Sequence, residues 1–261
     1  MNETILLDID GPVARITLTR PEAANGLTLP MCRELLQASI RCDEDPNVRA
    51  IVLTGAGKLF CAGGDLKSLA ESGEGVGATL KEMTVYLHGA ISRLARGDAP
   101  VVLAINGTAA GAGMSLAVAG DLGIASENAK FTLAYTAAGL SPDGSSSFFL
   151  PRLIGVRRTQ ELMLTNRRLS AAEALEWGLV NQVVPETEVL KQADELARTL
   201  AQGPTRSFGI VKKLLATSFS ESLETQMEFE ASGIARSAAS EDGQEGIRAF
   251  LEKRPPVFRG R

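Results

Sequence analysis

The fold of this chain is decided by two glycine-rich stretches, Cys61-Ala62-Gly63-Gly64-Asp65-Leu66 and Gly107-Thr108-Ala109-Ala110-Gly111-Ala112-Gly113. Each stretch lies just beyond a short β-branched apolar run, which predicts a strand. Bare backbone N–H groups at strand ends suit the stabilisation of a developing oxyanion, and each such donor is worth roughly 3 kcal/mol in a dry site. The two stretches therefore indicate which charge is stabilised, but not which side chain carries out the chemistry.

Strand and helix signals alternate on both sides of these stretches. Thr28 is a suitable N-cap for a helix that continues to about Arg41. The predicted strands are 5–10, 13–19, 50–53, 100–105, 121–125 and 179–184, and the predicted helices are 28–41, 79–96, 113–119, 145–153, 156–165 and 171–177. Because strands that alternate with helices imply crossover connections, the predicted fold class is α/β with a mostly parallel sheet.

Only helical signals follow Pro185. We therefore divide the chain into a mixed α/β core, residues 1–185, and a helical C-terminal region, residues 186–261. Apolar residues recur at helical spacing in 217–239, although the core already accounts for one complete domain. Helices with a spare apolar face indicate contact with another subunit.

Length and composition limit the class of protein. The chain has 261 residues, of which 44% are hydrophobic and 22% charged, and its net charge is −4. These values suit one large core and argue against disorder and against a nucleic-acid surface. Three cysteines without a Cys-x-x-Cys pair and a single histidine predict neither a disulfide framework nor a metal site. Such cysteine usage fits a reducing cytoplasm, and the mild charge favours a small-molecule partner. No apolar run approaches the roughly 20 residues of a membrane span.

Several further motifs, together with the two glycine-rich stretches, give the chain a pattern that resembles the enoyl-CoA hydratase/isomerase (crotonase) superfamily. These motifs are Arg20-Pro21-Glu22, Leu175-Glu176-Trp177-Gly178-Leu179-Val180 and Phe250-Leu251-Glu252-Lys253-Arg254. The resemblance covers nearly the whole chain. It implies a crotonase-like spiral of ββα units with a helical C-terminal region, assembled as a homotrimer or a dimer of trimers. It also implies an acyl-CoA thioester as substrate, so that coenzyme A is part of the substrate and no other cofactor is needed.

The resemblance assigns roles to individual residues. The N–H groups of Gly64 and Ala112 would bind the thioester oxygen and stabilise its enolate. Lys253 and Phe258 would contact the nucleotide of coenzyme A, often from a neighbouring subunit. The residues expected to bind substrate are Ala24, Ala62, Asp65, Leu66, Tyr135, Lys253 and Phe258.

The two catalytic glutamates of the hydratases are absent from this sequence. Ser115 and Tyr135 stand in their places, and neither an alkyl hydroxyl nor a phenol, whose usual pKa is roughly 10, serves as a carboxylate base near neutral pH. Asp143 falls where isomerases and the 4-chlorobenzoyl-CoA dehalogenases of this superfamily carry a catalytic acid. We therefore expect an isomerase-type proton transfer through Asp143, and N-capping of the following helix is the alternative role of its side chain.

His88 is the remaining candidate catalytic side chain. In the dehalogenase branch a histidine at a similar helix position acts as a general base, whereas packing on a half-buried helix face is the alternative. Four other functions stay open on the sequence alone. They are a dehalogenase-like hydrolase, an enoyl-CoA hydratase, a Clp-like serine hydrolase that uses Ser115 with His88, and a non-catalytic acyl-CoA binder.

Overall fold

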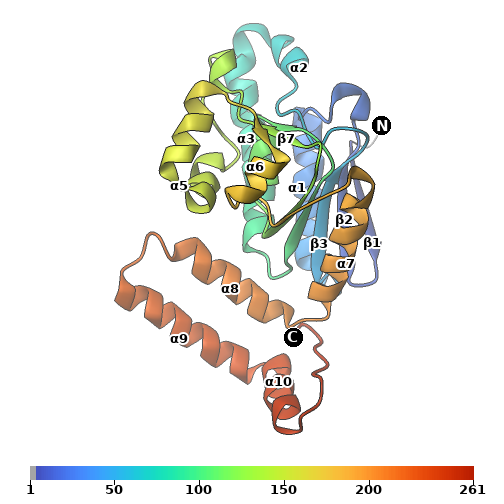
Figure 1. The fold of residues 1–261 in the computed structure, drawn as a ribbon, viewed down its shortest axis with the longest axis vertical. Helices are drawn as coiled ribbons and strands as arrows, with labels where there is room; N and C mark the ends of the chain where they lie inside the picture. Colours follow the sequence, from blue (N-terminus) through green and yellow to red (C-terminus); the bar gives the residue numbers. More distant parts are fainter. Residues whose placement is uncertain (1–3) are drawn as a thin grey trace.

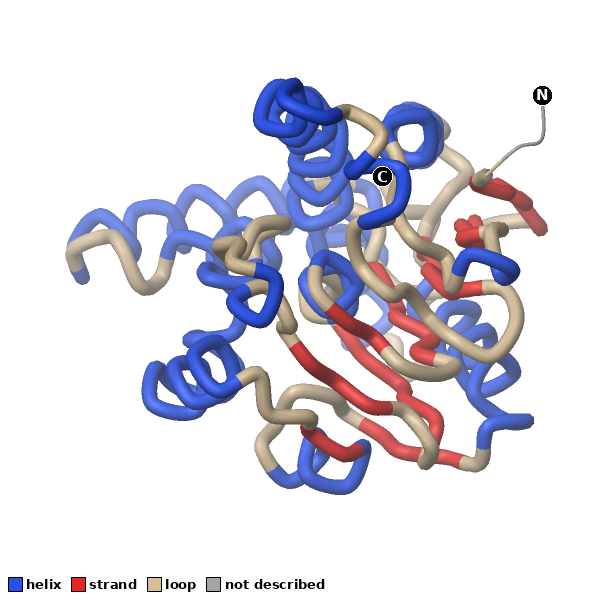
Figure 2. The backbone as a smooth tube through the Cα atoms, turned by 90° about the horizontal axis from the view of Figure 1, so that it is seen from above, coloured by secondary structure: helices blue, strands red, loops and turns tan. Residues whose placement is uncertain are grey.

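A six-stranded sheet forms the centre of the molecule, which a computed structural model describes over residues 4–261. In spatial order its strands are β1 (Ile5–Asp10), β2 (Val13–Leu18), β3 (Ala50–Gly55), β4 (Val101–Ile105), β6 (Leu122–Ser126) and β9 (Gln182–Val184). β1 and β2 form the predicted antiparallel hairpin, and the other neighbouring pairs are parallel. Figure 2 shows the strands side by side with helices around them. The predicted α/β class is confirmed, and the first three residues of the predicted core lie outside the described residues.

Helices cover both faces of this sheet. In chain order, the α-helices of the described residues are α1 (Leu29–Glu44), α2 (Leu66–Ala70), α3 (Val76–Arg96), α4 (Ala112–Ala117), α5 (Ser146–Thr165), α6 (Ala171–Glu176), α7 (Val189–Ala201), α8 (Thr205–Thr217), α9 (Leu223–Ala239) and α10 (Glu241–Leu251). Thr28 caps α1 as predicted, and Gly155 interrupts α5 between the two helices predicted there. Between residues 4 and 261, no helix combines the length and the apolar character needed to cross a membrane.

The central strands are buried on both sides. All residues of β3 and β4 are buried, as expected for parallel strands between two layers of helices. Leu53 belongs to the larger hydrophobic cluster, which includes residues of α1 and α3, whereas its neighbour Val52 belongs to a smaller cluster with α7. Because successive side chains of a strand point to opposite faces, α7 covers the face opposite α1 and α3.

The helices after residue 185 do not all lie apart from the sheet. Val189, Ala193 and Ala197 of α7 pack against Val52 and Val102 of the sheet. The part that stands away from the sheet begins after α7, near Gly203, and consists of α8, α9 and α10 (Figure 1). The core thus extends beyond the boundary placed at residue 185, because the small side chains of α7 fit closely against the strands.

A second, three-stranded sheet was not predicted. It consists of β5 (Ala109–Ala110), β7 (Lys130–Thr132) and β8 (Leu169–Ser170). β5 lies inside the second glycine-rich stretch and pairs in parallel with β7, and the Gly111 N–H donates to the Thr132 carbonyl at 3.0 Å. This small sheet fixes the backbone just before α4.

A buried lysine attaches α8 to the core. The Nζ of Lys212 lies 2.8 Å from Oδ2 of Asp121 and donates to the carbonyls of Leu94 and Ala99, each at 2.9 Å. Burial raises the pKa of Asp121, although the ammonium group beside it opposes this effect. The contact orients the helices that leave the sheet.

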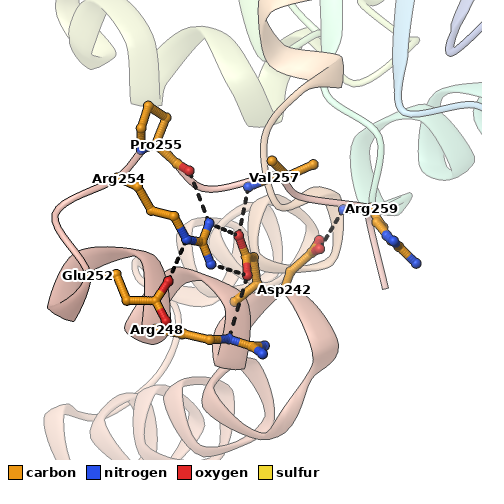
Figure 3. A network of polar contacts seen from close by, with 8 residues as sticks. Asp242, Arg248, Glu252, Arg254, Pro255, Val257 and Arg259 are labelled. Carbon is orange, nitrogen blue, oxygen red and sulfur yellow. Dashed lines mark hydrogen bonds and ion pairs between the residues drawn. The ribbon is translucent and has the colours of Figure 1, made fainter.

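The last residues of the chain fold back onto α10. Arg254 donates to the carboxylate of Glu245 at 2.6 and 3.0 Å, and Glu245 also accepts from the Val257 N–H at 3.0 Å. Asp242, which is buried, accepts from the N–H groups of Arg259 and Gly260. Figure 3 shows how these side chains gather between α10 and the tail. The C-terminal segment is thereby held on its own helix.

Candidate active site

The two glycine-rich stretches follow β3 and β4 and lie against each other. The Cys61 N–H donates to the Thr108 carbonyl at 3.2 Å, and the Ala110 N–H donates to the Cys61 carbonyl at 2.9 Å. A Cβ atom at position 113 would lie only 2.1 Å from the Cys61 carbonyl oxygen. Gly113 is therefore required for the close approach of the two stretches.

The backbone N–H groups of Gly64 and Ala112 lie where the two stretches meet. Leu27 pairs with the residues on either side of Gly64: it donates to the Gly63 carbonyl at 2.7 Å and accepts from the Asp65 N–H at 2.9 Å. Ala112 is the first residue of α4, and the first N–H groups of a helix have no partner within it. Within residues 4–261 neither the Gly64 nor the Ala112 N–H has an acceptor, and both residues line one cavity. These are the two donors predicted from the sequence.

The cavity beside these donors has a volume of about 120 Å³ and a mostly apolar wall. Its polar side chains are those of Thr84, Tyr135 and Asp143, and among the described residues Asp143 supplies its only carboxyl group. The other lining residues are Leu27, Ala62, Gly64, Leu66, Leu69, Leu80, Met83, Leu87, Gly111, Ala112, Leu133, Ala134, Ala138 and Leu140. One carboxylate thus shares a mostly apolar space with the N–H groups of Gly64 and Ala112.

Tyr135 and Ser115 hold Asp143 from two sides. The Tyr135 hydroxyl donates to Oδ1 of Asp143 at 2.6 Å. The Ser115 hydroxyl donates to the backbone carbonyl of Asp143 at 2.8 Å and lies 3.1 Å from the Tyr135 hydroxyl. The two positions that lack the hydratase glutamates therefore supply hydrogen bonds to the aspartate.

His88 contacts the loop that carries Asp143 from outside the cavity. Its Nε2 accepts a hydrogen bond of 3.2 Å from the Gly144 N–H, so this nitrogen carries no proton in the interaction. The peptide group between Asp143 and Gly144 is consequently held at both ends, by Ser115 and Ser146 on the carbonyl and by His88 on the N–H. His88 is exposed and does not line the cavity.

The protonation state of Tyr135 follows from its surroundings. Burial raises the pKa of its phenol well above the usual range, and the nearby charge of Asp143 adds to this effect. The phenol therefore stays protonated and remains a donor to Asp143. Burial also raises the pKa of the Cys32 and Cys61 thiols to about 12, which makes thiolate chemistry at this site unfavourable.

The residues expected to bind the acyl group have different surroundings. Ala62 and Leu66 line the cavity, and the Ala24 carbonyl accepts from the Ala62 N–H at 3.0 Å. Asp65 instead caps α2 through the Ser68 N–H and lies 3.0 Å from the Arg20 guanidinium. Burial opposes its ionisation, but these hydrogen bonds outweigh burial and keep its pKa below the usual value. The Asp65 side chain supports the first glycine-rich stretch and lies outside the cavity lining.

The two residues expected at the nucleotide lie elsewhere in this chain. Lys253 is exposed just after α10, and the Phe258 carbonyl accepts from Arg49 at 3.1 Å. Figure 1 places α10 at the opposite end of the molecule from α2, which borders the cavity. Neither residue is brought to the cavity of its own chain.

The geometry disfavours two alternative roles. Ser145, not Asp143, is the N-cap of α5, and the Asp143 carboxylate is bonded to Tyr135 instead. Ser115 is fully buried and its hydroxyl donates to a carbonyl, and within residues 4–261 no hydrogen bond joins it to His88. The serine is therefore not arranged as an activated nucleophile. The described residues also contain no group of three or more His, Cys, Asp or Glu side chains suited to hold a metal ion.

Asn25 supports the site and was missed in the sequence. Its fully buried side chain donates to the carbonyls of Ala56, Leu59 and Phe60, and its Oδ1 accepts from the Arg20 N–H. It thereby fixes the loop that leads into the first glycine-rich stretch. The only signal in the sequence is the Asn-Gly pair at 25–26. That pair indicates a turn, and it does not indicate a buried side chain with several hydrogen bonds.

Comparisons with known proteins agree with this geometry. The sequence profile of the enoyl-CoA hydratase/isomerase family matches residues 8–261. The chain is 37% identical to 1,2-epoxyphenylacetyl-CoA isomerase of Escherichia coli (strain K12), over all of both chains. It is 38% identical to 4-chlorobenzoyl coenzyme A dehalogenase-2 of Arthrobacter sp, over 92% of this chain and 88% of that protein. A crystal structure of enoyl-CoA hydratase from Bacillus anthracis matches with a TM-score of 0.92 at 35% identity, covering 99% of this chain and 100% of that one. The predicted spiral fold with a helical C-terminal region is thereby confirmed.

Proposed function

Because this chain belongs to the enoyl-CoA hydratase/isomerase family, we propose that it moves a double bond along the acyl group of an acyl-CoA thioester. One observation carries this proposal. Among the described residues the cavity has a single carboxyl group, Asp143, which lies in the same cavity as the free N–H groups of Gly64 and Ala112. A single positioned carboxylate can take a proton and return it, which is what double-bond migration requires.

The reaction follows from the positions of these groups. The thioester oxygen accepts hydrogen bonds from the Gly64 and Ala112 N–H groups. Asp143 takes a proton from C2 of a 3-enoyl thioester, and the electron pair of the broken C–H bond moves into the enolate. The same carboxyl group then returns the proton to C4, so that the double bond moves from C3–C4 to C2–C3 with no atom gained or lost. Each backbone donor contributes roughly 3 kcal/mol to stabilising the enolate oxygen.

Tyr135 determines which oxygen of Asp143 reacts. Its hydroxyl donates to Oδ1, whereas Oδ2 has no hydrogen-bond partner among residues 4–261. Oδ2 is therefore the oxygen that would exchange the proton with substrate. Coenzyme A belongs to the substrate in this scheme, and no other cofactor takes part.

Two other activities of the family fit the cavity less well. Hydration by two carboxylates would need a second acid, but Asp143 is alone among the lining residues of the described chain. Dehalogenase-like hydrolysis would need His88 to activate water, but its Nε2 is engaged by the Gly144 N–H behind the loop. Proton transfer by one carboxylate needs neither a second acid nor a general base at position 88.

We further propose that the chain works as a homotrimer or a dimer of trimers. Large apolar side chains are exposed along α8, α9 and α10, namely Val211, Leu215, Leu223, Met227, Ile234, Phe250 and Leu251. Exposed apolar faces of this extent are typical of subunit interfaces. A neighbouring copy would cover them and would bring its own Lys253 and Phe258 to the nucleotide of a bound acyl-CoA.

The decisive experiment replaces the carboxylate and keeps its shape. Asp143→Asn should lower kcat for the isomerisation of 3-enoyl-CoA by about 100-fold or more, with the Kd for acyl-CoA unchanged in calorimetry. Asp10→Asn is the control, because Asp10 is an exposed partner of Arg198. An Asp143→Asn variant that retains wild-type turnover would refute the assignment.

A further inference from the structure

The acyl cavity has an open end and a closed end. Leu66 and Leu140 line it with exposures of 58% and 38%, so they stand at the mouth. Leu69, Met83 and Leu87 line it with exposures of 5%, 7% and 3%, so they form the closed end. Met83 and Leu87 come from α3 and Leu69 from α2. An acyl chain that enters at the mouth therefore meets a wall of aliphatic side chains.

The size of the cavity limits the length of the chain that it holds. A cavity of roughly 150 Å³ lined by apolar side chains accommodates one benzene molecule. The volume here is about 120 Å³, which is somewhat smaller. Longer acyl groups would have to displace Met83 or Leu87 from the packed core, and such rearrangements are unfavourable in a close-packed interior.

The polar groups of the lining have no free donor for the acyl group. The Thr84 hydroxyl donates to the Lys81 carbonyl at 2.8 Å, and the Tyr135 hydroxyl donates to Asp143. Among the described residues of the lining there is no lysine, arginine or histidine. A carboxylate on the acyl group would face the charge of Asp143 without a compensating cation, and a hydroxyl among Leu69, Met83 and Leu87 would lose its hydrogen bonds to water, which is costly.

Resting on the proton-shuttle function proposed above, we infer that the substrate is a short, uncharged and unsubstituted enoyl-CoA, with an acyl chain on the order of four to six carbon atoms. Met83 sets the length limit at the closed end. The aliphatic wall selects for hydrocarbon and against charged or polar substituents. A hydrophobic pocket discriminates against an added hydroxyl, or against one methylene group too many, by roughly 10- to 100-fold.

A series of 3-enoyl-CoA thioesters with 4, 6, 8 and 10 acyl carbons tests this inference. We expect kcat/KM to be highest for the 3-butenoyl and 3-hexenoyl compounds and to fall at least tenfold for 3-decenoyl-CoA. We also expect 6-hydroxy-3-hexenoyl-CoA to react at least tenfold more slowly than 3-hexenoyl-CoA. Equal values along the series, or equal values for the hydroxylated compound, would overturn the inference. Failure of every member of the series to isomerise would instead overturn the proposed function.

Variants of α3 test the closed end directly. Met83→Ala should raise kcat/KM for 3-octenoyl-CoA relative to 3-butenoyl-CoA by at least tenfold. Leu94→Ala is the matched control, since Leu94 is buried on the same helix but lies outside the lining of the cavity, and it should leave the order of substrates unchanged. Should Met83→Ala not fold, as judged by circular dichroism, Met83→Val is used in its place. An unchanged order of substrates in a folded Met83 variant would contradict the role of this residue.

Discussion

The hydroxyl of Tyr135 lies 2.6 Å from Oδ1 of Asp143, so that a phenol held in its protonated form donates to the candidate proton-shuttle carboxylate. Hydrogen bonds to charged groups are worth about 1.5–3 kcal/mol. This hydrogen bond orients the carboxylate, and Oδ2 stays free to exchange a proton with the substrate in the proposed reaction. Tyr135 was expected to contact substrate, and it lines the cavity, but its hydroxyl serves the aspartate.

We predict that Tyr135→Phe lowers kcat by roughly 10- to 100-fold with little change in KM, because the aspartate loses its orienting donor while the ring stays in place. Steady-state kinetics with a 3-enoyl-CoA measure this effect. Tyr86→Phe is the matched control, since the chain has only two tyrosines and Tyr86 contacts Arg33 outside the cavity lining. Equal losses in both variants would indicate a structural effect instead.

Local signals were sufficient for the main sheet, whereas the two backbone donors were placed through the family resemblance. β3 and β4 were predictable because strands buried on both faces give continuous apolar runs. The glycine-rich stretches after those strands indicated backbone donors in general, and the resemblance assigned this role to Gly64 and Ala112. The cap at Thr28 was likewise visible, since its hydroxyl accepts from the Met31 N–H three residues later.

The contacts between distant segments could not be predicted in this way. Asp143 is held by Ser115 and Tyr135, which lie 28 and 8 residues before it in the chain, and by His88 through Gly144. Their meeting depends on β5 and β7, strands of two and three residues that carry too few side chains for a periodic signal. The packing of α7 on the sheet was unpredictable for another reason: its apolar spacing predicts a helix with one buried face, but not which surface that face contacts.

A second prediction concerns His88 as an acceptor. His88→Leu removes the acceptor of the Gly144 N–H, so the loop that carries Asp143 should be held less firmly. We expect kcat to fall about tenfold, which corresponds to the free energy of one hydrogen bond. His88→Gln offers an amide oxygen on a side chain of similar reach and should restore most of the activity. Binding of acyl-CoA, measured by calorimetry, should be unchanged in both.

The same pair of variants separates positioning from general-base catalysis. A glutamine cannot take a proton from water, so a reaction that depends on His88 as a base would be lost in His88→Gln as severely as in His88→Leu. Equal and large losses in the two variants would therefore contradict the positioning role. They would favour the dehalogenase-like hydrolase.

A third prediction concerns the tail held by Glu245. Hydrogen bonds from Arg254, and also from the Val257 N–H, lower the pKa of Glu245 from 4.5 to about 2. A lowered pKa means that the interaction is fully present above pH 4.5 and is lost as the pH falls from there towards 2. The tail should therefore stay on α10 between pH 8 and pH 5.

Glu245→Gln imitates the protonated state at neutral pH. Limited trypsin digestion at pH 7.5 should then cleave after Lys253 several times faster than in the wild type, because Arg254 loses its charged partner. Glu252→Gln is the control, since Glu252 is a more exposed partner of the same arginine. Cleavage at the same rate in all three proteins would show that the tail is held without Glu245.

The last prediction concerns assembly through the helices that stand away from the sheet. Leu223 and Ile234 on α9 are each 70% exposed, so neither side chain is needed to fill the core of its own chain. We expect light scattering to show a trimer or a hexamer for the wild type at micromolar concentration.

Leu223→Glu combined with Ile234→Glu places two charges on the face that a neighbouring copy would bury, and burying unpaired charges is strongly unfavourable. The double variant should therefore be monomeric, with an unchanged circular dichroism spectrum and weaker binding of acyl-CoA, because Lys253 and Phe258 of the neighbouring copy are lost. A wild-type protein that is monomeric, or a double variant that assembles normally, would contradict an interface on α9.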